Sequence, residues 1–186
     1  PSLAVLGNAK AWRAIDLAHG KPYLLHGPTG CGKTAGVRAY LAHHGVACRE
    51  IDVTDARSPA ELGKLLRSAC SAGLCGAWAL LVDDAEAIFE YEHMAQAFLE
   101  WLCTPRAAHV PVFVCVNDLY ARPLQKLRAL VDASHASKVP LYAPYRSACL
   151  AFYKQRYPTA WIRHATRDAD NDLRQVANAL EAREEL

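Results

Sequence analysis

The chain has 186 residues, of which 52% are hydrophobic and 22% are charged, and its formal net charge is +2. This balance excludes an intrinsically disordered chain, and the length suits one domain or one domain with a small appendage. With so small a net charge, the protein is neither strongly basic nor strongly acidic overall, so any basic patch must be local. We see no signal peptide and no apolar run of membrane-spanning length, and the seven cysteines lie mostly in apolar runs. We therefore expect an intracellular protein with reduced thiols and no membrane partner.

Short apolar runs alternate with helical patterns along most of the chain. The apolar runs predict five buried strands, and the segments between them carry helical periodicity or helix-start signals. The expected strands are residues 22–26, 46–53, 77–82, 110–116 and 138–142, and the expected helices are residues 9–18, 34–44, 58–72, 87–103 and 123–132. This alternation predicts an α/β fold with a mostly parallel five-stranded sheet flanked by helices.

The composition changes at Ala143-Pro144. After this point only helical patterns remain, at about residues 146–157 and 171–184, with a break at Pro158. The sequence therefore predicts an α/β domain over residues 1–143 and a small helical lid over residues 144–186.

One glycine-rich stretch between the first expected strand and the following helix has the spacing G-x-x-x-x-G-K-T of a phosphate-binding loop. Its glycines allow successive backbone N–H groups to turn toward an anion, and the helix that follows points its positive end at the same phosphates. The lysine can reach the β- and γ-phosphates, and the threonine offers a hydroxyl to Mg²⁺. The loop is Gly27, Pro28, Thr29, Gly30, Cys31, Gly32, Lys33 and Thr34. We therefore expect ATP and Mg²⁺ as cofactors.

Two acids follow the third expected strand, at the carboxyl end where ligands of open α/β sheets bind. Asp83 is a candidate Mg²⁺ ligand, together with Thr34, and Asp84 is a candidate base for the attacking water. Asp84 is one methylene shorter than the glutamate that P-loop ATPases usually carry at this position, so it is expected to position water less well. The alternative is that both acids form a solvated turn that caps the next helix.

Two further polar residues are candidates for the same site. Asn117 follows the fourth expected strand, where its amide could hold the attacking water or touch the γ-phosphate; the alternative is an ordinary turn residue. Arg174 is expected in the first turn of the last helix, with Asp170 or Asn171 as its N-cap. A cation there opposes the helix dipole, which favours a role at the triphosphate. The alternative is a surface arginine paired with Asp170 or Asp172.

Together these residues resemble the AAA+ clamp-loader family, and most of all the large subunit of replication factor C and the alternative loader of chromosome transmission. The glycine-rich loop and Leu81-Val82-Asp83-Asp84 are similar to the Walker A and Walker B motifs of that family. The narrower likenesses are Leu6-Gly7-Asn8 near the adenine pocket, Val114 to Tyr120 at sensor 1, Leu127 to Leu130, and Asn171 to Arg174 with Asn178 and Leu180 at sensor 2.

The resemblance implies an ATPase module that couples ATP binding and hydrolysis to partner and DNA engagement in DNA replication. Leu6 would then line the nucleotide site, and Arg174 would bind the nucleotide and act in hydrolysis. The implied partners are other AAA+ subunits, a sliding clamp and primer-template DNA, and the implied location is nuclear in a eukaryote or a viral replication compartment.

The chain departs from this family at Asp84 and at the small-subunit arginine finger, where Leu127-Arg128-Ala129 stands as in large subunits. We also expect neither a collar domain nor a clamp-docking domain in it. We therefore expect slow hydrolysis without partner subunits, in an excerpt of a longer protein or a compact relative. The alternatives are a nucleotide-binding structural subunit with little hydrolysis, a P-loop kinase, or a replication initiator.

Overall fold

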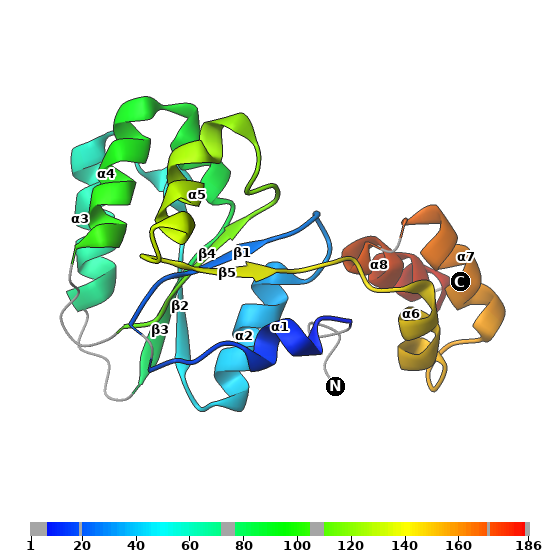
Figure 1. The fold of residues 1–186 in the computed structure, drawn as a ribbon. Coiled ribbons are helices and arrows are strands. Elements are labelled where there is room, and N and C mark those ends of the chain that lie inside the picture. Colours follow the sequence, from blue (N-terminus) through cyan, green and yellow to red (C-terminus); the bar gives the residue numbers. More distant parts are fainter. Residues whose placement is uncertain (1–6, 19, 72–76, 105–109, 171, 185–186) are drawn as a thin grey trace.

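The computed structural model describes residues 7–18, 20–71, 77–104, 110–170 and 172–184. Its centre is a five-stranded sheet in the order β2-β3-β4-β1-β5, and every adjacent pair of strands is parallel (Figure 1). The strands are β1 (Tyr23–His26), β2 (Ala47–Ile51), β3 (Trp78–Val82), β4 (Val112–Val116) and β5 (Ser137–Pro140). The expected parallel α/β fold is therefore confirmed.

The apolar runs become the central strands because a parallel sheet is covered on both faces. All five residues of β4 are buried, and so are the last four of β3. Alternate side chains enter different cores: Leu24 of β1 packs into one cluster, and its neighbours Tyr23 and Leu25 pack into the other. The sequence pattern thus determines that helices must cover both sides of the sheet.

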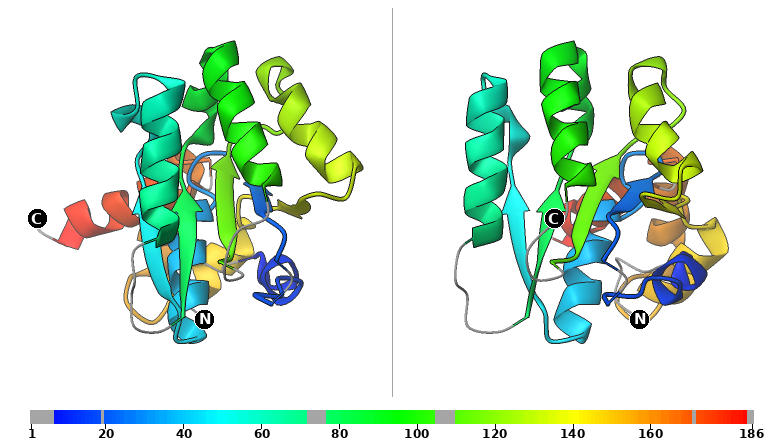
Figure 2. Two further views of the ribbon diagram at one scale, coloured as in Figure 1. Left: turned by 90° about the vertical axis from the view of Figure 1, so that its left-hand side faces the viewer. Right: turned by 60° about the vertical axis from the view of Figure 1, so that its left-hand side comes forward.

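Two helical layers provide this cover. On one face lie α3 (Pro59–Ser71), α4 (Glu92–Cys103) and α5 (Gln125–Asp132), which stand side by side in Figure 2. On the other face lie α1 (Ala9–Arg13) and α2 (Lys33–His43). The described residues of this part of the fold also include the short 3₁₀ helices η2 (Val53–Asp55), η3 (Ala85–Glu90) and η4 (Arg122–Leu124).

The last three helices form a separate small bundle beyond the carboxyl ends of the strands (Figure 1). They are α6 (Arg146–Tyr153), α7 (Thr159–Asp168) and α8 (Leu173–Glu184). Their buried side chains form a hydrophobic cluster of their own, which includes Cys149, Ile162 and Val176. This separate core is what a lid over residues 144–186 requires, and the domain boundary itself stays a prediction.

Helix α7 was not expected. Pro158 was expected to interrupt a helical region, but it lies immediately before α7, at the N-cap position. Proline suits a helix start because its fixed φ and missing N–H cost nothing there. Behind it, Ile162 and Ala165 recur at helical spacing and are buried in the lid core.

Several expected boundaries also differ. The helix expected over 9–18 ends at Arg13, and the helix expected over 87–103 is divided into η3 and α4. The expected strand 46–53 ends at Ile51, and the expected helix 146–157 ends at Tyr153. Three of these differences fall at the end of an element, where boundaries are least fixed by local sequence, and the division at Tyr91 falls inside the expected helix.

The amide side chain of Asn8 connects the start of the described chain to the segment that leads to the lid. Its Nδ2 donates to the carbonyl of Tyr142, and its Oδ1 accepts from the N–H of the same residue, both at 2.9 Å. Asn8 is buried, so these bonds satisfy a polar group that would otherwise be costly to bury. Within the ranges that the structure describes, no helix is long and apolar enough to cross a membrane.

Candidate functional site

The phosphate-loop sequence connects β1 to α2, as expected. Gly30 and Gly32 both have a positive φ, of 70° and 91°, in the left-handed region that glycine enters at little cost. Gly32 is the N-cap of α2, and no side chain caps this helix end. The helix start therefore lies at the loop with uncapped backbone donors, which is the arrangement that binds anions.

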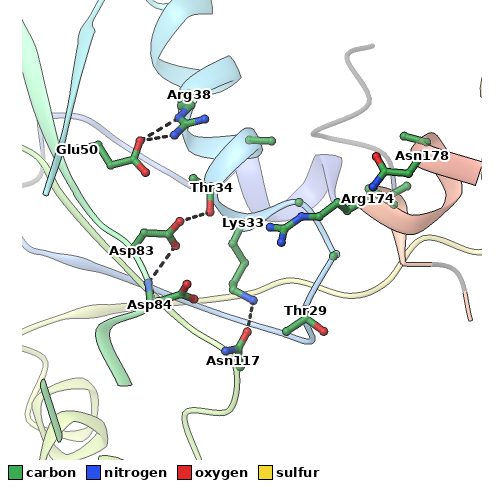
Figure 3. A pocket seen from close by; sticks show the side chains of 15 residues that line it. Thr29, Lys33, Thr34, Arg38, Glu50, Asp83, Asp84, Asn117, Arg174 and Asn178 are labelled. Atoms are coloured by element: carbon green, nitrogen blue, oxygen red, sulfur yellow. Dashed lines mark hydrogen bonds and ion pairs between the residues drawn. The ribbon is translucent and has the colours of Figure 1, made fainter. Parts of the chain in front are cut away.

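Lys33 folds back over this loop. The residue is 8% exposed, and its Nζ donates to the carbonyls of Gly27 at 2.8 Å and Pro28 at 3.1 Å. A third hydrogen bond of 2.8 Å joins Nζ to Oδ1 of Asn117 (Figure 3). The ammonium group is thus fixed between the loop and the carboxyl end of β4, and Asn117 lies in the same crevice as the loop, as expected.

Thr34 and Asp83 lie together. The Thr34 hydroxyl donates to Oδ2 of Asp83 at 2.6 Å (Figure 3). A hydroxyl and a carboxylate oxygen at this separation are the kind of ligands that Mg²⁺ takes, because Mg²⁺ usually binds one or two protein oxygens and completes its shell with water and substrate phosphates. In the part of the chain that the structure describes, no group of three or more His, Cys, Asp or Glu side chains is placed to hold a metal. The protein oxygens therefore fit a magnesium ion carried with a nucleotide.

Asp84 has an unusual backbone conformation, with φ 44° and ψ 44°. This left-handed region costs most residues free energy but is open to Asp and Asn. Asp84 occupies the N-cap position of η3, yet its side chain makes no capping hydrogen bond, and its N–H donates to Oδ1 of Asp83 at 3.1 Å. The carboxylate is thus left exposed toward the cavity described below, where it can accept a proton from water.

The lid reaches the phosphate loop through the start of α8. The Leu173 N–H donates to the Gly30 carbonyl at 2.9 Å. Asp172 caps this helix, because its Oδ1 accepts from the N–H groups of Arg174 at 2.9 Å and Gln175 at 3.1 Å. The expected cap at Asp170 is wrong: Asp170 has φ 45° and precedes the helix, and Asn171 lies outside the described residues.

Arg174 does lie in the first turn of α8, as expected, and points toward the phosphate loop (Figure 3). Among the residues that the structure describes, it forms no ion pair with Asp170 or Asp172. Its neighbour one turn later, Asn178, faces the same space. The guanidinium group is therefore available to a ligand.

These groups line one cavity of about 710 Å³ between the loop, the strand ends and the lid. Its lining contains three basic side chains and three acidic ones. They are Lys33, Arg38 and Arg174, and Glu50, Asp83 and Asp84. Thr29, Gly30, Gly32, Thr34, Asn117 and Asn178 also line it. The volume is within the range of small-molecule and cofactor sites.

Two charged lining residues were not expected from the sequence. Arg38 lies one helical turn beyond Thr34, and its guanidinium forms a hydrogen-bonded ion pair with Oε2 of Glu50 on β2 (Figure 3). This pair raises the pKa of Arg38. The i+4 spacing from Thr34 could have indicated Arg38, whereas Glu50 depends on where β2 pairs with β3.

Two other loop residues do not line the cavity. Cys31 is buried beneath the loop, and burial raises the pKa of its thiol although Lys33 acts in the opposite direction. The thiol therefore adds no negative charge to the site. Pro28 contributes its carbonyl to Lys33. Leu6, the expected adenine-pocket residue, lies outside the described residues.

His26 ends β1 directly before the loop. Its ring lies edge-on to Tyr120, with the ring centroids 5.8 Å apart. Burial lowers the pKa of His26, and the positive charges of Lys138 and Lys33 lower it further, whereas Asp118 raises it. The imidazole is therefore neutral at pH 7 and leaves the positive charge of the loop to Lys33.

Comparison with known proteins decides the family. The model of the family described as "ATPase family associated with various cellular activities (AAA)" matches residues 23–134, from β1 to just beyond α5 and more than half of the chain. The chain belongs to the AAA family. The AAA fold implies nucleotide binding, which agrees with the lining of the cavity.

Two solved structures share the fold of this AAA protein. The Walker-type ATPase paby2304 of Pyrococcus abyssi aligns with a TM-score of 0.67 over 94% of this chain at 14% identity. A structure described as the structural basis for katanin self-assembly aligns with a TM-score of 0.54 over 73% of the chain at 18% identity. The chain spans 66% and 45% of the lengths of these two proteins. No curated protein sequence matches it significantly.

Proposed function

We propose that this AAA protein binds Mg²⁺-ATP in the cavity between the phosphate loop and the lid, and hydrolyses it slowly until another subunit stimulates it. The observation that carries the proposal is the convergence of Lys33, the Thr34–Asp83 pair, Asn117 and Arg174 around one space. These groups come from the loop, two strand ends and the lid, and they offer the phosphate contacts, the metal ligands and the water-positioning group that phosphoryl transfer uses.

Each residue has a role in this proposal that follows from its chemistry. Lys33 exchanges its carbonyl partners for oxygens of the β- and γ-phosphates, and Thr34 and Asp83 hold the metal through oxygen atoms. Mg²⁺, when bound, neutralises charge that develops between the β- and γ-phosphates. Asp84 orients and deprotonates the attacking water, and Asn117 holds that water or the γ-phosphate. Arg174 binds the γ-phosphate from the lid.

The position of the lid would depend on whether ATP is bound. The lid touches the loop through the Leu173–Gly30 hydrogen bond, and Arg174 follows one residue later on the same helix. A γ-phosphate held by both Lys33 and Arg174 would draw the two parts together. Such closure is how ATP binding can be coupled to partner engagement.

The test is single-turnover hydrolysis of ATP with protein in excess, together with a measurement of ATP affinity. We expect the isolated protein to bind ATP and to turn it over poorly, because an arginine in trans adds about 10³- to 10⁵-fold to such phosphoryl transfers. Asp84→Asn keeps the shape and the tolerated backbone conformation but removes the base, so it should retain binding and abolish turnover, including turnover stimulated by a neighbouring subunit. Rapid hydrolysis by the isolated protein, or full turnover by Asp84→Asn, would contradict the proposal.

A nucleotide-binding structural subunit with little hydrolysis is the second candidate. It is favoured by Asp84, whose carboxylate is one methylene shorter than the usual glutamate and is held by a left-handed backbone. Such a subunit would bind ATP with the same residues. It would show no stimulation by any AAA partner, whereas the first candidate would.

We further propose that the protein acts as a clamp-loader-like subunit, with other AAA+ subunits, a sliding clamp and primer-template DNA as its partners. The support is the order of its motifs, in particular the segment that ends in Asn117-Asp118-Leu119-Tyr120 and the Asp172-Leu173-Arg174 start of α8. DNA contact should be made to phosphates, so binding by the isolated chain should be weak and fall steeply with salt. Tight, salt-insensitive or base-specific binding would contradict this role.

A further inference from the structure

The backbone N–H, the backbone carbonyl and the side-chain oxygen of Asn117 are all hydrogen-bonded. Its carbonyl accepts from the N–H of Gly27 at 3.1 Å, and its Oδ1 accepts from Lys33 at 2.8 Å. Its own N–H donates to Oε1 of Glu86, a residue 31 positions earlier in the chain. The phosphate loop therefore fixes the carbonyl and the side chain, and η3 fixes the N–H.

Glu86 is an uncommon choice for a purely structural contact. Its second carboxylate oxygen, Oε2, is buried and has no hydrogen-bond partner among the residues that the structure describes. A buried carboxylate oxygen without a partner is costly, because it gives up its water and gains nothing in return. What Glu86 provides is reach, because its side chain extends from η3 to the backbone at the end of β4 and presents an acceptor oxygen there.

The position of Glu86 explains what such a bond can do. Glu86 lies on η3, two residues after Asp84, and does not itself line the cavity. Its carboxylate thus joins the segment that carries the acid at the end of β3 to the backbone of the amide at the end of β4. Both of these polar groups line the cavity, where the γ-phosphate and the attacking water would lie.

We propose that Glu86 is a positioning residue for ATP hydrolysis: it sets the Asn117 amide relative to Asp84 by holding the Asn117 N–H. The inference rests on the ATPase function proposed above. Glu86 touches no reacting atom and acts through Asn117. Nucleotide binding rests chiefly on the loop, Lys33 and Thr34, so displacing Asn117 should slow hydrolysis far more than it weakens binding.

The experiment compares Glu86→Asp and Glu86→Gln with the wild type, using single-turnover ATP hydrolysis and ATP affinity. Aspartate keeps the charge but is too short to reach the Asn117 N–H, whereas glutamine keeps the length and an acceptor oxygen. We expect Glu86→Asp to bind ATP as the wild type does but to hydrolyse it roughly 10- to 100-fold more slowly, the size of effect that a small misplacement causes. Glu86→Gln should recover most of the rate. The matched control is Glu90→Ala, an exposed acid at the end of the same 3₁₀ helix, which should change neither quantity.

A double variant separates positioning from a general loss of structure. If Glu86 acts through Asn117, then adding Glu86→Asp to Asn117→Ala should slow hydrolysis no further, because two residues of one unit are not additive. Equal rates for Glu86→Asp and the wild type, or additive effects in the double variant, would overturn the inference. A wild-type protein that does not bind ATP would instead overturn the proposed function, so the two failures can be told apart.

Discussion

The carboxyl group of Asp172 lies where the Cβ of any larger residue at Gly30 would have to be. The same carboxylate caps α8, and the next residue donates its N–H to the Gly30 carbonyl at 2.9 Å. Lid and phosphate loop therefore meet at a residue with no side chain. Gly30 thus has two reasons to be glycine: its φ of 70° and this close approach.

Replacing Gly30 should therefore cost more than its backbone conformation alone. Gly45 is the matched control, because its φ is 67° and an added Cβ there meets nothing within 4 Å. We expect Gly45→Ala to lower the free energy of unfolding by about 1–2 kcal/mol, the cost of a left-handed residue. Gly30→Ala should lower it by about 1 kcal/mol more, the value of a helix cap, because Asp172 must move away. Urea unfolding of both variants measures the difference. Equal decreases in the free energy of unfolding would contradict the prediction, because they would mean that Asp172 can move away without cost.

Arg174 should bind the γ-phosphate from the lid. It lines the cavity and forms no ion pair with any described residue, so its charge is free for a ligand. We expect Arg174→Ala to weaken ATP binding about tenfold, since hydrogen bonds to charged groups contribute about 1.5–3 kcal/mol, and to weaken ADP binding less. Titration with both nucleotides measures this preference. Arg183→Ala, on the same helix and away from the cavity, is the control, and an equal loss in both variants would remove Arg174 from the site.

His26 should make stability depend on pH below its usual pKa. Its pKa in the folded state lies below the ordinary value of 6.5, chiefly through burial. The unfolded chain therefore binds the proton more readily, and the free energy of unfolding should fall as the pH drops below 6.5 toward the folded-state pKa. His26→Phe keeps a ring against Tyr120 but cannot be protonated, so its stability should fall less between pH 7.5 and 5.5. Urea unfolding at several pH values checks this, and parallel curves for the two proteins would contradict it.

Much of this fold follows from the sequence, because its strongest signals are local. The continuous apolar runs of β3 and β4 predict strands buried on both faces, and the loop from Gly27 to Thr34 marks the strand-to-helix connection that contains the site. Asp83 and Asn117 could be placed because the carboxyl ends of neighbouring parallel strands meet at one edge of the sheet.

The remainder depends on contacts between distant segments, which no local pattern contains. The Glu86–Asn117 bond spans 31 positions, and the Arg38–Glu50 ion pair requires the register of β2. Asp172 was not expected as the cap of α8, because Asp170, Asn171 and Asp172 are all residue types that cap helices. In the structure the helix begins at Leu173, which is bonded to Gly30, and Asp172 therefore has the cap position. Helix α7 was missed because a proline can end one helix or begin another.

The most direct test of the account is the affinity of Lys33→Ala for Mg²⁺-ATP, measured by calorimetry against the wild type. Lys33 is the buried cation at which the loop and the β4 end meet, and its charge-assisted contacts to the triphosphate are the strongest in the proposed site. Lys126→Ala, which removes an exposed lysine paired with Glu92, is the control for charge. We predict that Lys33→Ala weakens ATP binding at least about tenfold, which corresponds to about 1.4 kcal/mol, while Lys126→Ala leaves it unchanged. An ATP affinity that is the same in Lys33→Ala and the wild type would contradict the assignment of this cavity as the nucleotide site.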